Sequence, residues 1–157
     1  MTDARPPLAK RIDHVGVAVR DIEKALPFYL DVLGMTVSVD VRLADGSARL
    51  AYLEAGDTTL QLVQPLLPGS VADFLAAHGE GLHHVCFVVD DLVAALGSLP
   101  GDEPVDGIYV GGRQCRVSFA TGRPNGVIIE LTEPLPVPTR DASQDPVPVR
   151  PSVTPAT

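Results

Sequence analysis

The stretch IDHVGVAVRDIEKAL (residues 12–26) decides the fold, because it returns 70 positions later as LHHVCFVVDDLVAAL (residues 82–96). Both segments contain a histidine, alternating apolar residues and an aspartate in the same order. A second pair of segments matches at nearly the same shift, LQLVQP (60–65) with IELTEP (129–134). One structural unit therefore occurs twice in this chain.

Each unit is predicted to contain one helix and four strands. The first strand shows a period-two pattern with one apolar face. Asp21 and Asp91 then stand at helix N-cap positions, and Gly34 is placed to end the first helix. Three further strand-like runs follow, separated by the turn signals LADGS and AGD. The order is βαβββ, so we predict an α+β fold of two tandem units, related by a pseudo-twofold axis, that form a curved mixed sheet around a central metal site.

The domain organisation follows from these boundaries. We expect a loose leader over residues 1–10, a first βαβββ unit over 11–66, a linker helix over 67–80 and a second unit over 81–134. Residues 135–157 are rich in proline and poor in large apolar residues. Such a segment buries too little surface to offset its ordering entropy, so we expect a disordered tail.

Composition excludes several classes of protein. The formal net charge of −8 and the absence of a basic stripe argue against nucleic acid as a partner. No apolar run approaches the roughly 20 residues that cross a bilayer, and the first residues lack the apolar core of a secretion signal. We therefore expect a cytoplasmic protein that does not bind membranes. Cys86 and Cys115 form no short-spaced motif and are expected to be free thiols.

Strand alternation selects one histidine in each unit. In the first strand the valines at 15, 17 and 19 share one face, so His14 points to the other. In the second unit the same alternation predicts that His84 leaves the apolar face. It predicts that His83 lies on that face. We expect His83 to have a structural role, either hydrogen-bonding the backbone or lining the rim of the pocket.

The last strand of each unit adds an oxygen ligand. Gln61 is flanked by two leucines, and Glu130 is flanked by Ile129 and Leu131, so both polar residues should leave the apolar face. Two units folded about a twofold axis would gather His14, Gln61, His84 and Glu130 at one point. Each residue alone is more often a satisfied polar group, but four in repeat register predict a divalent metal site with open positions for substrate.

The sequence resembles the vicinal oxygen chelate superfamily, also called the glyoxalase/bleomycin-resistance fold, over about residues 11–134. IDHVGVAVRDIEKALPFYLDVLGM, GEGLHHVCFVVDDL and GVIIELTEP are most similar to the methylmalonyl-CoA epimerases. The resemblance implies one divalent ion (cobalt, manganese, magnesium, zinc or nickel) held by His14, Gln61, His84 and Glu130. It also implies a small-molecule substrate, such as an acyl-CoA, and we expect a homodimer.

The activity implied is removal of the proton α to a carbonyl, with the metal stabilising the enolate and Glu130 as a catalytic acid/base. Two positions depart from the family pattern. Many epimerases carry a second glutamate where this chain has Leu50, and the usual His-Pro-Lys is replaced by Ala120, Thr121 and Gly122. Glu54 and Tyr52 share the face of Leu50 by alternation, but each is expected to be a surface residue or part of the pocket wall. The second acid/base and the binding of a CoA tail are therefore open, although Arg113, Arg116 and Arg123 remain as local cations.

Other functions share this scaffold. A glyoxalase-type isomerase or lyase, or a natural-product enzyme with a small acid substrate, would use the same ligands. A ring-cleaving dioxygenase would use only His14, His84 and Glu130, on iron. A drug-sequestering protein of the bleomycin-resistance type would need no metal ligands, so the complete ligand set argues against it.

Overall fold

The computed structural model of the chain describes residues 7–100 and 107–135. One sheet of eight strands runs in the order β2-β3-β4-β1-β5-β8-β7-β6. The order reads outward in the same way from β1 and from β5, so the two units are related by a pseudo-twofold axis between these strands. The predicted fold class is confirmed. Most of the expected tail and residues 1–6 of the expected leader lie outside the described residues.

The first unit contributes one half of the sheet. Its elements are β1 (Arg11–Ala18), α1 (Ile22–Pro27), the π-helical turn η1 (Phe28–Val32), β2 (Thr36–Arg42), β3 (Ala48–Ala55) and β4 (Thr58–Pro65). Strands β1 and β4 pair in parallel, while β2, β3 and β4 form an antiparallel meander. This pairing brings the first and last strands of the unit side by side.

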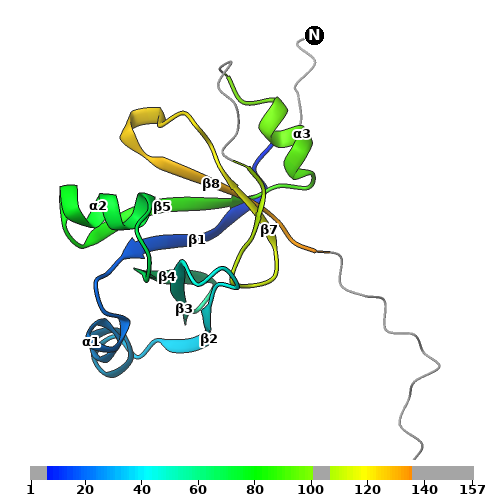
Figure 1. Ribbon diagram of the computed structural model, residues 1–157. Coiled ribbons are helices and arrows are strands. Elements are labelled where there is room, and N and C mark those ends of the chain that lie inside the picture. The colour runs from blue at the N-terminus through cyan, green and yellow to red at the C-terminus, as the bar shows by residue number, and fades with distance from the viewer. Residues whose placement is uncertain (1–6, 101–106, 136–157) are drawn as a thin grey trace, which may run out of the picture.

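The second unit repeats the arrangement after a connecting helix. Its elements are α2 (Ser70–His78), which lies within the expected linker, β5 (Gly81–Val88), α3 (Leu92–Gly97), β6 (Tyr109–Val110), β7 (Arg116–Phe119), the 3₁₀ turn η2 (Pro124–Gly126) and β8 (Ile128–Glu133). Strands β5 and β8 pair in parallel, as β1 and β4 do. Figure 1 shows β1 and β5 running through the middle of the molecule, with α1 and α3 far apart on either side.

The helix ends follow the local sequence. The Asp21 carboxylate accepts hydrogen bonds from the backbone N–H groups of Glu23 and Lys24, and Asp91 caps α3 through Ala94. Pro27 lacks an N–H group, and the α-helix ends there and continues as the π turn η1. Gly34 follows with φ of +70°, a conformation that favours glycine.

Two apolar cores lie beneath the helices. Ile22 of α1 packs with Leu53 and Leu62 of the sheet, and Leu92 of α3 packs with Val89 and Leu131. A third apolar cluster, around Leu50, Tyr52 and Val63, lies on the concave face instead. Helices α1 and α3 therefore each cover the convex face of their own half, and the concave face is left for the site.

Strands β1 and β5 are antiparallel and contain two register shifts. Ile12 pairs with Phe87 and His14 with Cys86, which leaves Asp13 as an extra residue in β1. Gly16 pairs with His84 and Val17 with Leu82, which leaves His83 as an extra residue in β5. Each shift is a β-bulge, which locally breaks the alternation of side chains.

The bulge in β5 makes the predicted face of His83 wrong, although His83 does line the pocket, which is one of the structural roles expected of it. Alternation placed this side chain on the apolar face of Val85 and Phe87, but the structure places it beside His84. The Nδ1 atoms of the two histidines are 2.9 Å apart, and both rings line the same cavity. The error arises because the period of two holds only where every residue of a strand is paired.

Candidate metal centre

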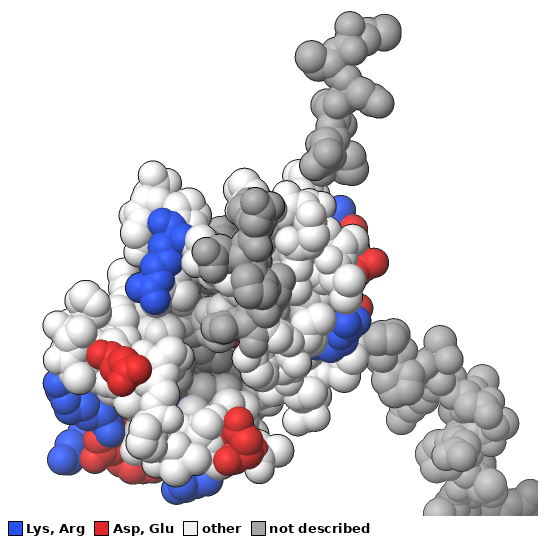
Figure 2. All heavy atoms as spheres, turned by 45° about the horizontal axis from the view of Figure 1, so that its top comes forward, with Lys and Arg blue, Asp and Glu red and all other residues white. Residues whose placement is uncertain are grey.

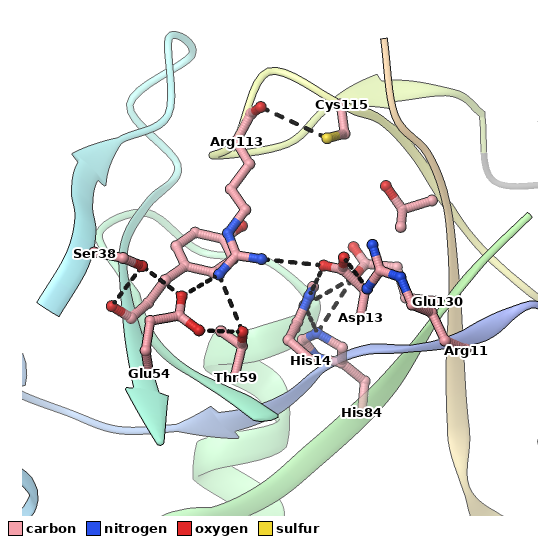
Figure 3. Close-up of polar contacts among 12 residues, drawn as sticks. Arg11, Asp13, His14, Ser38, Glu54, Thr59, His84, Arg113, Cys115 and Glu130 are labelled. Carbon is pink, nitrogen blue, oxygen red and sulfur yellow. Dashed lines mark hydrogen bonds and ion pairs between the residues drawn. The ribbon is translucent and has the colours of Figure 1, made fainter. Parts of the chain in front are cut away.

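Three polar side chains from three strands converge at the centre of the concave face (Figure 3). His14 comes from β1, His84 from β5 and Glu130 from β8. The Nε2 atoms of the two histidines are 3.2 Å apart, and Glu130 Oε2 lies 3.2 Å from His14 Nε2 and 3.4 Å from His84 Nε2. The two units thus contribute to one site, although His14 and His84 are 70 residues apart in the chain.

All three side chains are buried. Glu130 Oε2 is shielded from solvent and has no hydrogen-bond partner with proper geometry, although both imidazoles lie near it. A buried carboxylate oxygen without a hydrogen bond is costly, and a cation between the three ligand atoms would satisfy it. The two histidines and the glutamate offer nitrogen and oxygen donors within 4.8 Å of one another, a set that suits a divalent ion.

The charges at the centre stabilise one another. Burial opposes ionisation of Glu130, but the adjacent imidazoles of His14 and His84 outweigh it and hold the pKa of Glu130 well below its usual range. Burial also opposes protonation of His14, but Asp13 and Glu130 outweigh it and raise the pKa of His14. The glutamate is therefore an anion at neutral pH.

Gln61 lies on the same wall of the site. It is buried in β4, pairs with Gly16 of β1, and lines the cavity together with the two histidines and Glu130. Its amide is hydrogen-bonded to the hydroxyl of Tyr52 on the neighbouring strand β3. Burial raises the pKa of Tyr52, so this phenol stays neutral at physiological pH. Tyr52 therefore forms part of the pocket wall and holds Gln61.

The residue before each site histidine is the extra residue of a bulge. Asp13 Oδ2 lies 2.9 Å from Nδ1 of His14, while His83 Nδ1 lies 2.9 Å from Nδ1 of His84. The hydrogen bond to His14 lowers the pKa of Asp13. Burial, followed by the neighbouring His84, lowers the pKa of His83 to about 4, so His83 is neutral at physiological pH.

Arg113 links the two halves beside the site (Figure 3). Its guanidinium lies 2.6 Å from Glu54 Oε1, 3.6 Å from Asp13 Oδ2 and 4.4 Å from the centre of the Tyr52 ring. It belongs to the second unit, whereas these three partners belong to the first. Ser38 and Thr59 also donate hydrogen bonds to Glu54. The network joins Asp13 and Tyr52 to Arg113 and Glu54.

A cavity of about 460 Å³ is lined by the three converging side chains, His14, His84 and Glu130. Apart from the site residues and His83, its lining is largely apolar and includes Leu50, Val63 and Val71. Leu50 is 6% exposed and belongs to the apolar cluster of the concave face. Among the described residues of the lining, Asp45 at the β2–β3 turn is the only carboxylate other than Glu130. On the face drawn in Figure 2, charged side chains are scattered and do not gather into one patch.

A second hollow of about 480 Å³ adjoins the first and shares His83 and Phe119 with it. Arg123 and Thr121 line this hollow. Of the other local cations noted in the sequence, Arg113 is paired with Glu54, and Arg116 lies 3.3 Å from Glu133 Oε2. Among the described residues, Arg123 is thus the only arginine or lysine that lines either hollow.

The structure brings together the residues that the repeat selected, with Gln61 on the wall of the same cavity. It adds two that the sequence did not place at the site, namely Asp13 and Arg113, and it makes Tyr52 part of the pocket wall, one of the two places expected for that residue. Asp13 is the position equivalent to His83 in the repeat, which was a usable signal. Nothing in the sequence indicated that Arg113 would reach across to the first unit.

Duplicated βαβββ units that form one curved sheet, with histidine and carboxylate side chains meeting from their first and last strands, define the class of protein. The family model of the Glyoxalase/Bleomycin resistance protein/Dioxygenase superfamily matches residues 13–119. The chain belongs to this superfamily. None of the helices in residues 7–100 and 107–135 combines the length and the apolar character that crossing a membrane requires.

Relatives of known activity include isomerases. The mitochondrial methylmalonyl-CoA epimerase of Mus musculus is 42% identical over 88 residues, which cover 55% of this chain and 49% of the mouse protein. The chain thus matches about half the length of that relative. The crystal structure of methylmalonyl-CoA epimerase from Mycobacterium tuberculosis superposes with a TM-score of 0.74 at 31% identity, over 84% of this chain and 93% of that one. A variant of the Streptomyces coelicolor epimerase in complex with 2-nitronate-propionyl-CoA gives 0.72 at 29% identity, over 82% and 97%.

Proposed function

We propose that this protein is a metal-dependent isomerase that removes the proton α to a carbonyl, with a methylmalonyl-CoA-like thioester as its substrate. The observation that carries the proposal is that His14 and His84 both approach Oε2 of Glu130, a buried carboxylate oxygen that lacks a hydrogen bond. His14, His84, Glu130 and the Gln61 amide oxygen are the proposed ligands. The similarity to methylmalonyl-CoA epimerases supports the choice of substrate class.

The chemistry requires a stabilised enolate. A divalent ion bound by these residues would neutralise the negative charge that develops on the substrate oxygens. Glu130 is ionised at neutral pH and lies at the floor of the cavity, where it would take the α-proton. Tyr52 would keep Gln61 oriented through its hydroxyl, and the apolar wall around Leu50 would contact the substrate.

Inversion also needs a proton delivered to the opposite face. Leu50 cannot exchange a proton, and burial raises the pKa of Tyr52, which makes its phenol a weak proton donor. We therefore propose that water supplies the second proton. An acyl-CoA tail would extend into the second hollow, where Arg123 offers a cation.

The test is solvent exchange at the α-carbon. The chain is freed of metal by chelation, reloaded with Co²⁺, Mn²⁺, Mg²⁺, Zn²⁺ or Ni²⁺ in turn, and incubated with methylmalonyl-CoA in D₂O. We expect deuterium incorporation with at least one ion, and no incorporation after chelation or with His84→Ala. Absence of exchange with every ion would contradict the proposed activity.

A dioxygenase is the second candidate, because His14, His84 and Glu130 form a three-residue set while the Gln61 amide is engaged by Tyr52. Fe²⁺ would then be the active ion. Oxygen consumption with a catechol substrate and the iron-loaded protein would distinguish this function from the isomerase.

A further inference from the structure

The two bulges of the central strand pair place a hydrogen-bonding side chain behind each site histidine. Asp13 and His83 are equivalent in the 70-residue repeat, and each is the unpaired residue of its bulge. A regular strand would direct Asp13 and His14 to opposite faces of the sheet. The bulges instead bring each side chain to Nδ1 of the next residue, at 2.9 Å in both cases.

These contacts determine which ring nitrogen is free. A neutral imidazole carries its proton on one nitrogen and a lone pair on the other. If Nδ1 of His14 donates to the Asp13 carboxylate, the lone pair is on Nε2, the atom that faces Glu130 and His84. The same reasoning applies to His84, with Nδ1 of His83 as the acceptor.

Both partners are themselves held in place. Asp13 Oδ2 lies 3.6 Å from Arg113, and Asp13 Oδ1 lies 3.4 Å from Arg11. The buried ring of His83 packs edge-on against Phe74 of α2, with ring centres 4.8 Å apart. These contacts are made by residues outside the proposed ligand set, so the orientation of each histidine is set by the surrounding fold.

We propose that Asp13 and His83 are positioning residues of the metal centre, each fixing the tautomer and orientation of the adjacent histidine so that Nε2 is free to bind the ion. The inference rests on the proposed metal site but not on the identity of the substrate. The two partners differ, since one is a carboxylate and the other an imidazole. A carboxylate makes its histidine a stronger electron donor, so the two ligands are expected to be unequal.

The test is Co²⁺ binding to the metal-free full-length protein. Binding is measured by isothermal titration calorimetry and by the visible absorption spectrum of the bound ion. Asp13→Ala and His83→Phe remove the acceptor, and His83→Phe keeps a ring against Phe74. Each should weaken Co²⁺ binding by roughly 10- to 100-fold and shift the spectrum. Asp13→Asn and His83→Gln retain an acceptor oxygen and should recover part of the affinity.

Matched controls separate this role from a general effect on stability. His78→Phe changes another histidine that packs on Phe74, with ring centres 4.9 Å apart, and Asp31→Ala removes an exposed carboxylate. Both should bind Co²⁺ like the unsubstituted protein. Melting of each metal-free variant, followed by circular dichroism, reports on folding independently of the ion.

The outcomes are distinct. Folded Asp13→Ala and His83→Phe variants with unchanged affinity and spectrum would overturn the proposal. It would also be overturned at either position if neither substitution there yields a folded protein, because the residue would then be needed for the fold itself. Failure of the unsubstituted protein to bind any divalent ion would instead contradict the proposed metal-dependent function.

Discussion

The ring of His84 lies directly over the backbone of Gly16, where a β carbon would be 2.6 Å from Nε2 of the histidine. Gly16 pairs with both His84 and Gln61, so it stands between two proposed ligands on adjacent strands. The equivalent residue of the second unit is Cys86, which pairs with His14 and Glu130. The two halves therefore differ at this position, because the first has no side chain there and the second has a thiol.

Gly16→Ala should consequently displace His84. The added methyl group overlaps the ring, and overpacking of this kind costs about 1–3 kcal/mol. We expect a lower melting temperature and at least a roughly tenfold weaker affinity for Co²⁺, the affinity ratio that 1.4 kcal/mol represents. Gly81→Ala is the control, because a β carbon there meets no atom within 4 Å. A Gly16→Ala protein with unchanged metal affinity would show that His84 can move without loss of the site.

Removal of a proposed ligand should abolish stoichiometric metal. His84→Ala leaves one imidazole, the Glu130 carboxylate and the Gln61 amide oxygen, which is a weak donor, so a divalent ion should be held far less tightly. Elemental analysis of the purified protein after dialysis should find far less than one equivalent, against about one for the unsubstituted chain. His78→Ala on α2 should keep the full equivalent. Similar metal content in the two variants would remove His84 from the ligand set.

Metal affinity should rise with pH through the neutral range. Because the pKa of His14 is raised above its ordinary value, protons compete with the ion at pH values above 6.5 as well as below. Affinity should increase up to about tenfold per pH unit until the pH passes the raised pKa of His14, and then level off. His83, with a pKa near 4, should not contribute in this range. Calorimetric titrations in buffers of different ionisation enthalpy would count the protons released when the ion binds. A metal affinity that does not change between pH 6 and 8 would contradict the assignment of His14 as a ligand.

The same shift affects the metal-free protein. A group with a raised pKa in the folded state stabilises the fold below its unfolded pKa, and this contribution is lost as pH rises through the folded value. Protonated His14, paired with Asp13 and Glu130, should therefore stabilise the metal-free chain at pH 6 relative to pH 8. His14→Gln should reduce that difference in melting temperature. An equal pH dependence in both proteins would assign the effect to other groups.

Leu50 provides the test of the substrate. If water returns the second proton, exchange of the α-hydrogen with solvent should be faster than inversion of configuration. Leu50→Glu should increase inversion more than exchange, provided the new carboxylate is ionised. Burial in the apolar cluster would raise its pKa, so rates should be compared from pH 6 to 9. Leu50→Gln is the matched control, because an amide of similar size does not act as an acid/base as a carboxylate does. Equal gains from both substitutions would show that polarity, not proton transfer, limits the reaction.

The sequence by itself determined the duplicated βαβββ units, the helix caps and the residues that meet at the centre. A repeat carries this information because equivalent residues of two similar units occupy equivalent places around one axis. His14 with His84, and Gln61 with Glu130, could therefore be selected before any contact was known. Alternation then gave the correct face for His14 and His84, since both point away from the valine rows.

Only the tertiary structure decided how the histidines are held. A bulge depends on the register between two strands, so the positions of Asp13 and His83 required the pairing of β1 with β5. Alternation within one strand could not predict the bulges and gave the wrong face for His83. The reach of Arg113 to Glu54 and Asp13 likewise depends on how the two halves dock. Local sequence specifies which faces are apolar, whereas the partners of a side chain are set by strands that meet far apart in the chain.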